Sequence, residues 1–249
     1  MKKNPIKIIY FEKNKEQEED QTYGKILSLD TLEQIQGTYG QISEDELNQV
    51  EDSYRNQRRQ ALKDDDAQKY AQSIFGAFTD KDDILKTAQD VVIEYFELKL
   101  VIIEQSVKFF SKYGYGPQLQ QIMQRTSNKQ KEIVKPKNPV TEHKKIVEIF
   151  EFQQDLVENQ RSKILNYINQ LNMPPQQIQD ILSQMIGSYL LDKTYLKFNV
   201  EEEDVNEYLK VDKNWNSELE NLEKKINEGT FKIMNEFIAH KLKNMQRMG

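Results

Sequence analysis

The sequence predicts an all-α protein, a multi-helix bundle of long amphipathic helices preceded by a short extended N-terminal arm. The 249 residues include only nine Gly and six Pro, too few for the many turns of a sheet-rich fold. Apolar residues recur at intervals of three and four over long stretches, as on one face of a helix. The longest such stretch, residues 82–113, contains neither Gly nor Pro.

Residues 1–42 are predicted to form the extended arm and a short helix. Residues 6–11, IKIIYF, are typical of a β-strand. A single strand is not stable alone, so this run is expected either as a lone strand or as an arm that docks on a partner. The short helix is expected over residues 27–35, entered at Ser28 or Asp30 and ended by the glycines at 37 and 40.

A helical subdomain is predicted over residues 43–125. Residues 43–46, SEDE, match a capping box and predict a helix start. The three aspartates at 64–66 either break this helix or lie on its surface without interrupting it. A second start is predicted at residues 79–82, and residues 82–113 then form one central helix, buried on more than one side because its apolar stripe is broad.

The linker is predicted at residues 126–140, which are rich in Lys, include two prolines and lack a periodic apolar face. Residues 141–249 are predicted as a second helical subdomain. Pro175 suits the first turn of a helix. The helices expected here span about 141–171, the stretch after 174–175, 201–209, and 215–245 with an interruption at Gly229.

Two segments of the expected helices resemble each other. Residues 92–104, VIEYFELKLVIIE, and residues 146–158, IVEIFEFQQDLVE, share E-x-F-E followed by an aliphatic pair and Glu. A duplicated helix–proline–helix hairpin would produce this similarity. The periodicity common to all amphipathic helices is the other explanation.

The composition excludes several kinds of catalytic and metal-binding site. There are no cysteines, which excludes disulfides, thiolate catalysis and Cys-ligated zinc. The two histidines, His143 and His240, have no metal-binding companion at helical spacing, and the acidic clusters lack the pattern of a calcium loop. No phosphate-binding glycine motif occurs. The sequence therefore predicts no catalytic residue, no cofactor and no metal site.

A concentrated arginine patch supports a nucleic-acid hypothesis. Residues 49–59, QVEDSYRNQRR, resemble the homeodomain recognition helix pattern Q-V-x-x-W-F-x-N-x-R over eleven residues, with Ser53 in place of the tryptophan. The resemblance implies that Asn56 reads adenine and that Arg58 touches phosphate. The net charge of −6 argues against a dedicated nucleic-acid binder. The candidate contacts are Arg55, Asn56, Arg58 and Arg59, with a second basic patch at Lys135, Lys137, Lys144 and Lys145.

The expected function is that of a non-catalytic helical scaffold or accessory subunit in a larger intracellular complex, acting through protein–protein contacts. The candidate partner-binding residues are Ile6, Ile8, Tyr10 and Phe11 of the arm, and Trp215, which is otherwise a core residue. A DNA-binding accessory subunit that uses residues 55–59 is the alternative. An enzyme with a dispersed carboxylate or tyrosine site is the third hypothesis.

The sequence also predicts a soluble protein of the cytoplasm or nucleus. No segment approaches the roughly 20 apolar residues of a membrane span. The N-terminal residues 1–20 have a short apolar run that turns acidic. A secretory signal needs a longer apolar region and a transit peptide avoids acidic residues, so neither is expected.

Overall fold

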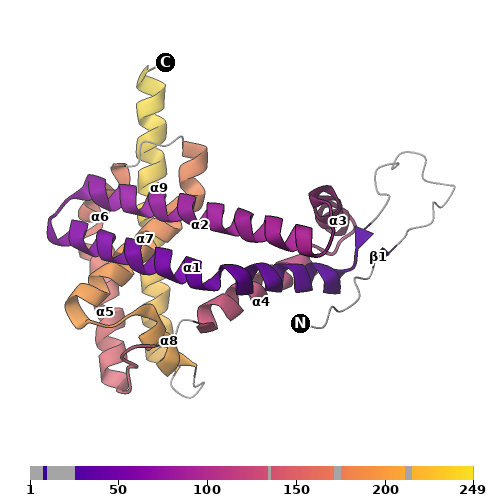
Figure 1. Cartoon of the computed structure of the whole chain (residues 1–249). Helices are drawn as coiled ribbons and strands as arrows, with labels where there is room; N and C mark the ends of the chain where they lie inside the picture. The colour runs from indigo at the N-terminus through magenta and orange to yellow at the C-terminus, as the bar shows by residue number, and fades with distance from the viewer. Residues whose placement is uncertain (1–7, 10–25, 134–135, 171–174, 211–214, 249) are drawn as a thin grey trace. The chain divides into compact units, whose positions relative to one another are not determined.

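The prediction of an all-α multi-helix bundle is confirmed. The computed structural model describes residues 8–9, 26–133, 136–170, 175–210 and 215–248. Over these ranges it has nine helices and two strands of two residues each (Figure 1). The elements are β1 Ile8–Ile9, β2 Ile26–Leu27, α1 Leu29–Lys63, α2 Ala67–Tyr95, α3 Leu100–Lys112, α4 Gly116–Ile133, α5 His143–Asn159, α6 Arg161–Asn169, α7 Pro175–Phe198, α8 Glu202–Leu209 and α9 Ser217–Met248.

The chain forms two compact units that are discontinuous in sequence. Unit 1 comprises Met1–Gln49 and Asp80–Val134, and unit 2 comprises Val50–Thr79 and Lys135–Gly249. This division differs from the sequential subdomains 43–125 and 141–249, because side chains from the end of α1 and the start of α2 belong to the core of the C-terminal helices. The expected linker 126–140 is also shorter, since α4 continues to Ile133.

Helix α1 is a single helix of 35 residues. Its start after Ser28 agrees with the sequence, because the Ser28 hydroxyl accepts a hydrogen bond from the backbone N–H of Thr31. The predicted helix start at Ser43 is wrong. Ser43 is buried inside α1 and its hydroxyl donates to the carbonyl of Tyr39 at 2.7 Å, so it bonds back along the helix instead of capping one. The helix likewise continues through Gly37.

The three aspartates after α1 break the helix. Residues 64–66 form the turn between α1 and α2, and Asp65 has a positive φ of 54°. Asp tolerates this left-handed conformation better than most residues. The alternative left open by the sequence is therefore decided in favour of a helix break.

The predicted single helix over residues 82–113 is two helices. α2 ends at Tyr95, Glu97 adopts a left-handed φ of 53°, and α3 begins at Leu100. The Leu98 N–H donates to the carbonyl of Ile93 at 2.9 Å, which is the bond of a helix C-terminal Schellman motif. Leu98 then packs on the core of unit 1. Tertiary packing of Leu98 thus ends a helix that neither Gly nor Pro interrupts.

Unit 1 has a small core. Its buried apolar residues are Ile26, Leu27, Leu32, Ile35, Tyr39, Val92, Ile103 and Phe110. Strands β1 and β2 pair antiparallel, with Ile8 opposite Leu27 and Ile9 opposite Ile26. The Leu27 N–H donates to the buried Ser106 hydroxyl of α3 at 2.8 Å. The described part of the arm is therefore paired with the chain itself, while Ile6, Tyr10 and Phe11 lie outside the described residues.

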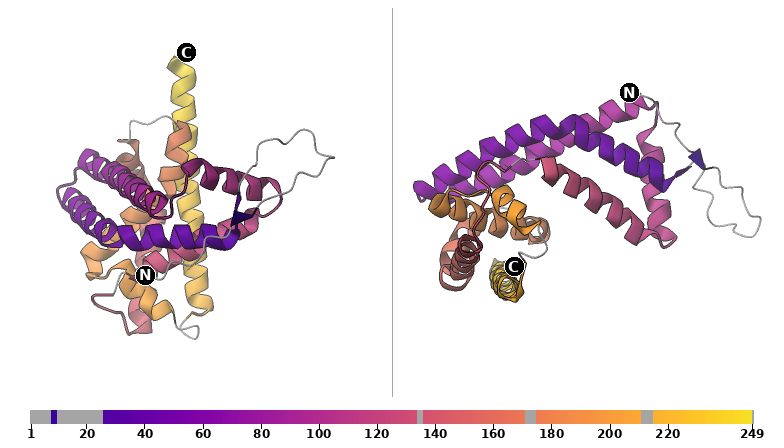
Figure 2. Two further views of the ribbon diagram at one scale, coloured as in Figure 1. Left: turned by 45° about the vertical axis from the view of Figure 1, so that its right-hand side comes forward. Right: turned by 90° about the horizontal axis from the view of Figure 1, so that it is seen from below.

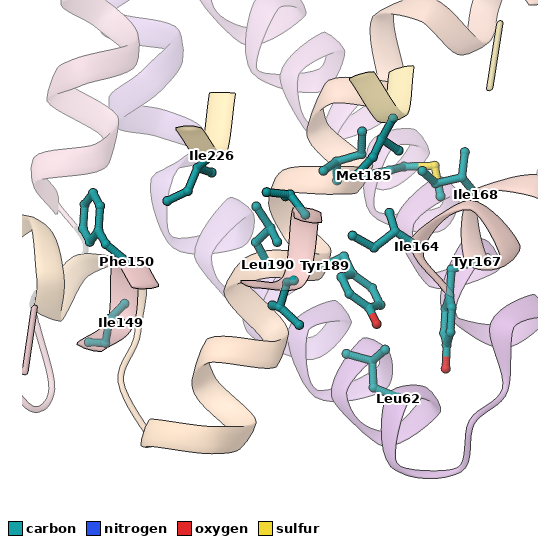
Figure 3. Close-up of a cluster of buried hydrophobic side chains, with 14 of the residues drawn as sticks. Leu62, Ile149, Phe150, Ile164, Tyr167, Ile168, Met185, Tyr189, Leu190 and Ile226 are labelled. Atoms are coloured by element: carbon teal, nitrogen blue, oxygen red, sulfur yellow. The ribbon is translucent and has the colours of Figure 1, made fainter. Parts of the chain in front are cut away.

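Unit 2 has a larger core, built from α5 to α9 and the adjoining parts of α1 and α2. The rings of Tyr70, Tyr167 and Tyr189 meet edge to face, with centroids 5.4–6.1 Å apart. Figure 3 shows Tyr167 and Tyr189 among the buried side chains of this core. Helices α5 and α9 lie side by side (Figure 2). The expected helix 141–171 is broken at Gln160 into α5 and α6, whereas α7 begins at Pro175 as predicted.

The two similar segments have different local structures. Residues 146–158 lie within α5, while residues 92–104 contain the break between α2 and α3. A duplicated hairpin would place the same element at both positions. The structure instead favours the common periodicity of amphipathic helices.

Candidate functional site

An arginine–carboxylate cluster lies inside unit 2, where the sequence placed its candidate nucleic-acid contacts. Helix α1 carries Arg55, Arg58 and Arg59 within two turns, so the three guanidinium groups extend toward the same neighbouring elements. Four carboxylates from three elements receive them. They are Glu51 of α1, Asp192 of α7, and Glu201 and Glu203 at the start of α8.

The cluster is closely bonded. Arg58 Nε donates to Asp192 Oδ2 at 2.7 Å, and Arg59 makes a bidentate pair with Glu201 at 2.9 and 2.6 Å. Arg55 Nη2 donates to Glu203 at 2.7 Å. The Arg59 guanidinium also lies 3.6 Å from the centroid of the Tyr195 ring. Bidentate pairing and stacking on an aromatic ring are interactions that suit arginine rather than lysine.

Burial dominates the electrostatics of this cluster. It raises the pKa of Asp192 above the ordinary carboxyl value, and Arg58 and Arg59 oppose that shift. It also lowers the pKa of Arg58, but the charge and hydrogen bond of Asp192 together with the charges of Tyr70 and Glu51 outweigh it, so the net shift of that pKa is upward. Burial and the Asp192 charge raise the pKa of the Tyr70 phenol well above its ordinary value. Tyr70 thus stays protonated and donates to Asp192 Oδ2 at 3.0 Å.

These contacts bear on the nucleic-acid hypothesis. Arg58 and Arg59 are buried and bonded to the chain's own carboxylates, whereas phosphate contact requires accessible cations. Asn56 is exposed on α1, while Lys144 is exposed and lies 3.8 Å from Glu148 on its own helix, and Lys145 is half-buried. Lys135 lies outside the described residues. Nucleic-acid contact by the arginines remains a prediction that would require the ion pairs to open.

Trp215 is half-buried at the entrance to α9. Its ring packs edge to face on Phe150, with centroids 6.2 Å apart. His143 lies nearby, with Nε2 3.2 Å from the Asn216 amide and 3.5 Å from Glu218. In the described part of the chain, no three His, Asp or Glu side chains are grouped so as to hold a metal ion.

Exposed apolar side chains are concentrated in unit 1. Among the described residues of unit 2, only Phe75 and Phe231 are large and exposed. The sequence analysis missed this surface because it assigned the whole apolar stripe of residues 82–113 to the core. Charges at Glu94, Glu104 and Lys108 between the apolar positions are the signal that marks one side as solvated. The exposed set in unit 1 is Ile42, Leu85, Val91, Tyr95, Leu100, Val101, Val107, Tyr113, Tyr115 and Met123.

Helix α3 shows how this exposure arises. Ile103, Ser106 and Phe110 face the core at intervals of three and four. Leu100 and Val107 are seven residues apart and border the buried side, because they lie three residues before and four residues after Ile103. Their exposed fractions are 41% and 39%, and that of the adjacent Val101 is 48%. One side of α3 thus packs on the core of unit 1, while apolar side chains at the border of that side and at Val101 are exposed to solvent.

Over the described residues, none of the helices is both long enough and apolar enough to cross a membrane. Comparison with protein-family models, with curated proteins and with solved structures finds no match to this chain.

Proposed function

We propose that the protein is a non-catalytic helical scaffold or accessory subunit of a larger intracellular assembly, and that it acts through protein–protein contacts. The observation that carries this proposal is the exposed apolar set on α2 and α3 of unit 1. Contiguous exposed apolar surface is typical of interaction sites, and single scattered apolar residues are not. Leu100 and Val107 share one side of α3 over two turns, and Val101 adds a further exposed apolar side chain on the same helix.

Covering this surface would supply part of the free energy of association. Covering a half-exposed Leu or Val side chain contributes about 1 kcal/mol. Micromolar binding corresponds to about 8 kcal/mol, so the aliphatic and aromatic side chains of α2 and α3 supply much of it before the loss of translational freedom is counted. The charges of Glu104 and Lys108 among them suit a partner surface that is partly polar.

The proposal is tested by recovering the tagged protein from its own cells and identifying co-purified proteins by mass spectrometry. The variant Val101→Glu/Val107→Glu places a charge at each of two exposed apolar positions of α3. The control Lys108→Gln/Ser111→Glu makes the same change in net charge at exposed polar positions of the same helix. The wild type and the control should retain the same partners, and the valine variant should lose them.

Two results would contradict the proposal. One is recovery of the wild type only as a monomer without a stable partner. The other is retention of every partner by Val101→Glu/Val107→Glu while its circular dichroism spectrum matches that of the wild type.

A further inference from the structure

A cavity of about 190 Å³ lies among α5, α7, α8 and the entrance to α9 in unit 2. Its apolar lining includes Ile149 and Phe150 of α5, and Val200 and Val205 beside and on α8, all of which are buried. Figure 3 shows Ile149 and Phe150 set apart from the tyrosine cluster of the core. Half-buried Trp215 completes an aromatic corner with Phe150. The cavity therefore offers a hydrocarbon-lined space with two aromatic rings.

The polar atoms that line this cavity are predominantly acceptors. Gln153 Nε2 donates to Thr194 Oγ1 at 3.1 Å, and that hydroxyl donates to the carbonyl of Leu190 at 2.8 Å. The side-chain amide oxygen of Gln153 remains available as a hydrogen-bond acceptor. Glu202 and Glu223 line the same cavity and form no ion pair with a described cation, whereas Glu201 is already paired with Arg59.

The charge of the lining decides the class of ligand. Among the described residues that line the cavity there is no Lys, Arg or His, while three carboxylates are present. An anion would meet the like charges of Glu202 and Glu223, since Glu201 is paired with Arg59. A cation with an apolar stem would place its stem against the aliphatic side chains and the rings of Trp215 and Phe150. Its charge would lie near the carboxylates of Glu202 and Glu223 and over an exposed ring face.

We propose that this cavity binds an alkylammonium group. The group is supplied either by a free amine or by the lysine side chain of a polypeptide, because both present the same ammonium on a short hydrocarbon chain. The charge stays near the solvent-accessible rim, where Glu223 is exposed. Binding therefore does not require full desolvation of an ion, which would be strongly unfavourable.

The experiment uses the full chain and the fluorescence of Trp215, which is the only tryptophan. n-Pentylamine, n-pentanol and the tripeptide acetyl-Ala-Lys-Ala-amide are titrated separately at neutral pH, with isothermal calorimetry as a second readout. n-Pentylamine should bind saturably with a Kd of about 1 mM or tighter, and at least about fivefold more tightly than n-pentanol. Binding of the tripeptide identifies a polypeptide lysine as the source, and its failure beside amine binding identifies a free amine.

Substitutions separate the cavity from general surface charge. Glu202→Gln/Glu223→Gln should weaken amine binding about fivefold or more and leave n-pentanol binding unchanged. Glu220→Gln is the control, because Glu220 is an exposed glutamate of α9 outside this cavity. Equal affinity for amine and alcohol, unchanged amine binding in the double variant, or no saturable binding of either the amine or the tripeptide would overturn the proposal.

Discussion

Asp192 is the buried carboxylate of unit 2 that Arg58, Arg59 and Tyr70 surround. Its side chain is 1% exposed and it receives Arg58 and Tyr70 on one oxygen. The other oxygen lies 3.3 Å from Arg59 Nε without the geometry of a hydrogen bond. A buried ion pair gains little over well-packed apolar residues, but removing one partner leaves a charge without compensation. Arg58 and Asp192 are therefore expected to tolerate joint replacement better than single replacement.

Arg58→Met should lower the free energy of unfolding by about 3–5 kcal/mol, because Asp192 loses its principal partner inside the core. Urea unfolding followed by Trp215 fluorescence measures the change. Lys144→Met is the control, since Lys144 pairs with Glu148 at an exposed site of unit 2 and should change stability by at most about 1 kcal/mol. Arg58→Met/Asp192→Asn should recover part of the loss. An equal loss of unfolding free energy in Arg58→Met and in the control would show that burial of the Arg58–Asp192 pair does not affect stability.

The packing of α5 against α9 depends on a residue that the sequence analysis interpreted only as an interruption. A Cβ atom at Gly229 would lie 2.5 Å from Val157 Cγ2 and 2.8 Å from Val157 Cβ. Val157 is fully buried, so it has no room to move. α9 nevertheless continues through this position from Ser217 to Met248. The glycine is thus required for the close approach of two helices.

Gly229→Ala should destabilise unit 2 by about 1–3 kcal/mol through overpacking against Val157, despite the better helix propensity of alanine. Gly187→Ala in α7 is the matched control, because a Cβ there meets nothing within 4 Å. That control should gain about 0.5–1 kcal/mol. Thermal unfolding measured for both variants checks the opposite signs. A stabilised Gly229→Ala would show that α5 and α9 can separate without loss.

At the scale of the whole molecule, the chain has two separate hydrophobic cores. The unit 1 core and the unit 2 core share no residue, and the former has far fewer buried side chains. A small core buries less apolar area and gives lower stability. Unit 1 also carries the exposed apolar set, so binding of a partner would add the burial that this unit lacks.

Ile103→Ala should unfold unit 1 selectively, because losing a buried isoleucine costs about 2–5 kcal/mol. The part of the helical circular dichroism signal that comes from unit 1 should be lost at a lower urea concentration. The fluorescence transition of Trp215, which lies in unit 2, should stay at the same urea concentration. Ile233→Ala, at a fully buried position of unit 2, should instead shift the Trp215 transition. Coincident shifts of both signals in both variants would indicate a single cooperative unit.

Part of this architecture follows from the sequence alone. The helical class, the cap at Ser28 and the start of α7 at Pro175 depend on periodicity and on side chains close in sequence. Such local preferences are physical properties of short segments, so they can be inferred without the fold. The cluster Arg55, Arg58 and Arg59 was also recognised as a concentrated patch, although its partners were not.

Only the tertiary structure decided the remainder. Glu201 and Asp192 are more than 130 residues from their arginines, so no local pattern distinguishes a buried ion-pair cluster from a phosphate-binding surface. Residues 43–46 match the sequence of a capping box, but Ser43 lies inside a helix. Residues 82–113 have unbroken helical periodicity but turn at Glu97, because Leu98 packs on the unit 1 core. Sequence periodicity determined that helices form, and long-range packing determined where they end and which sides stay exposed.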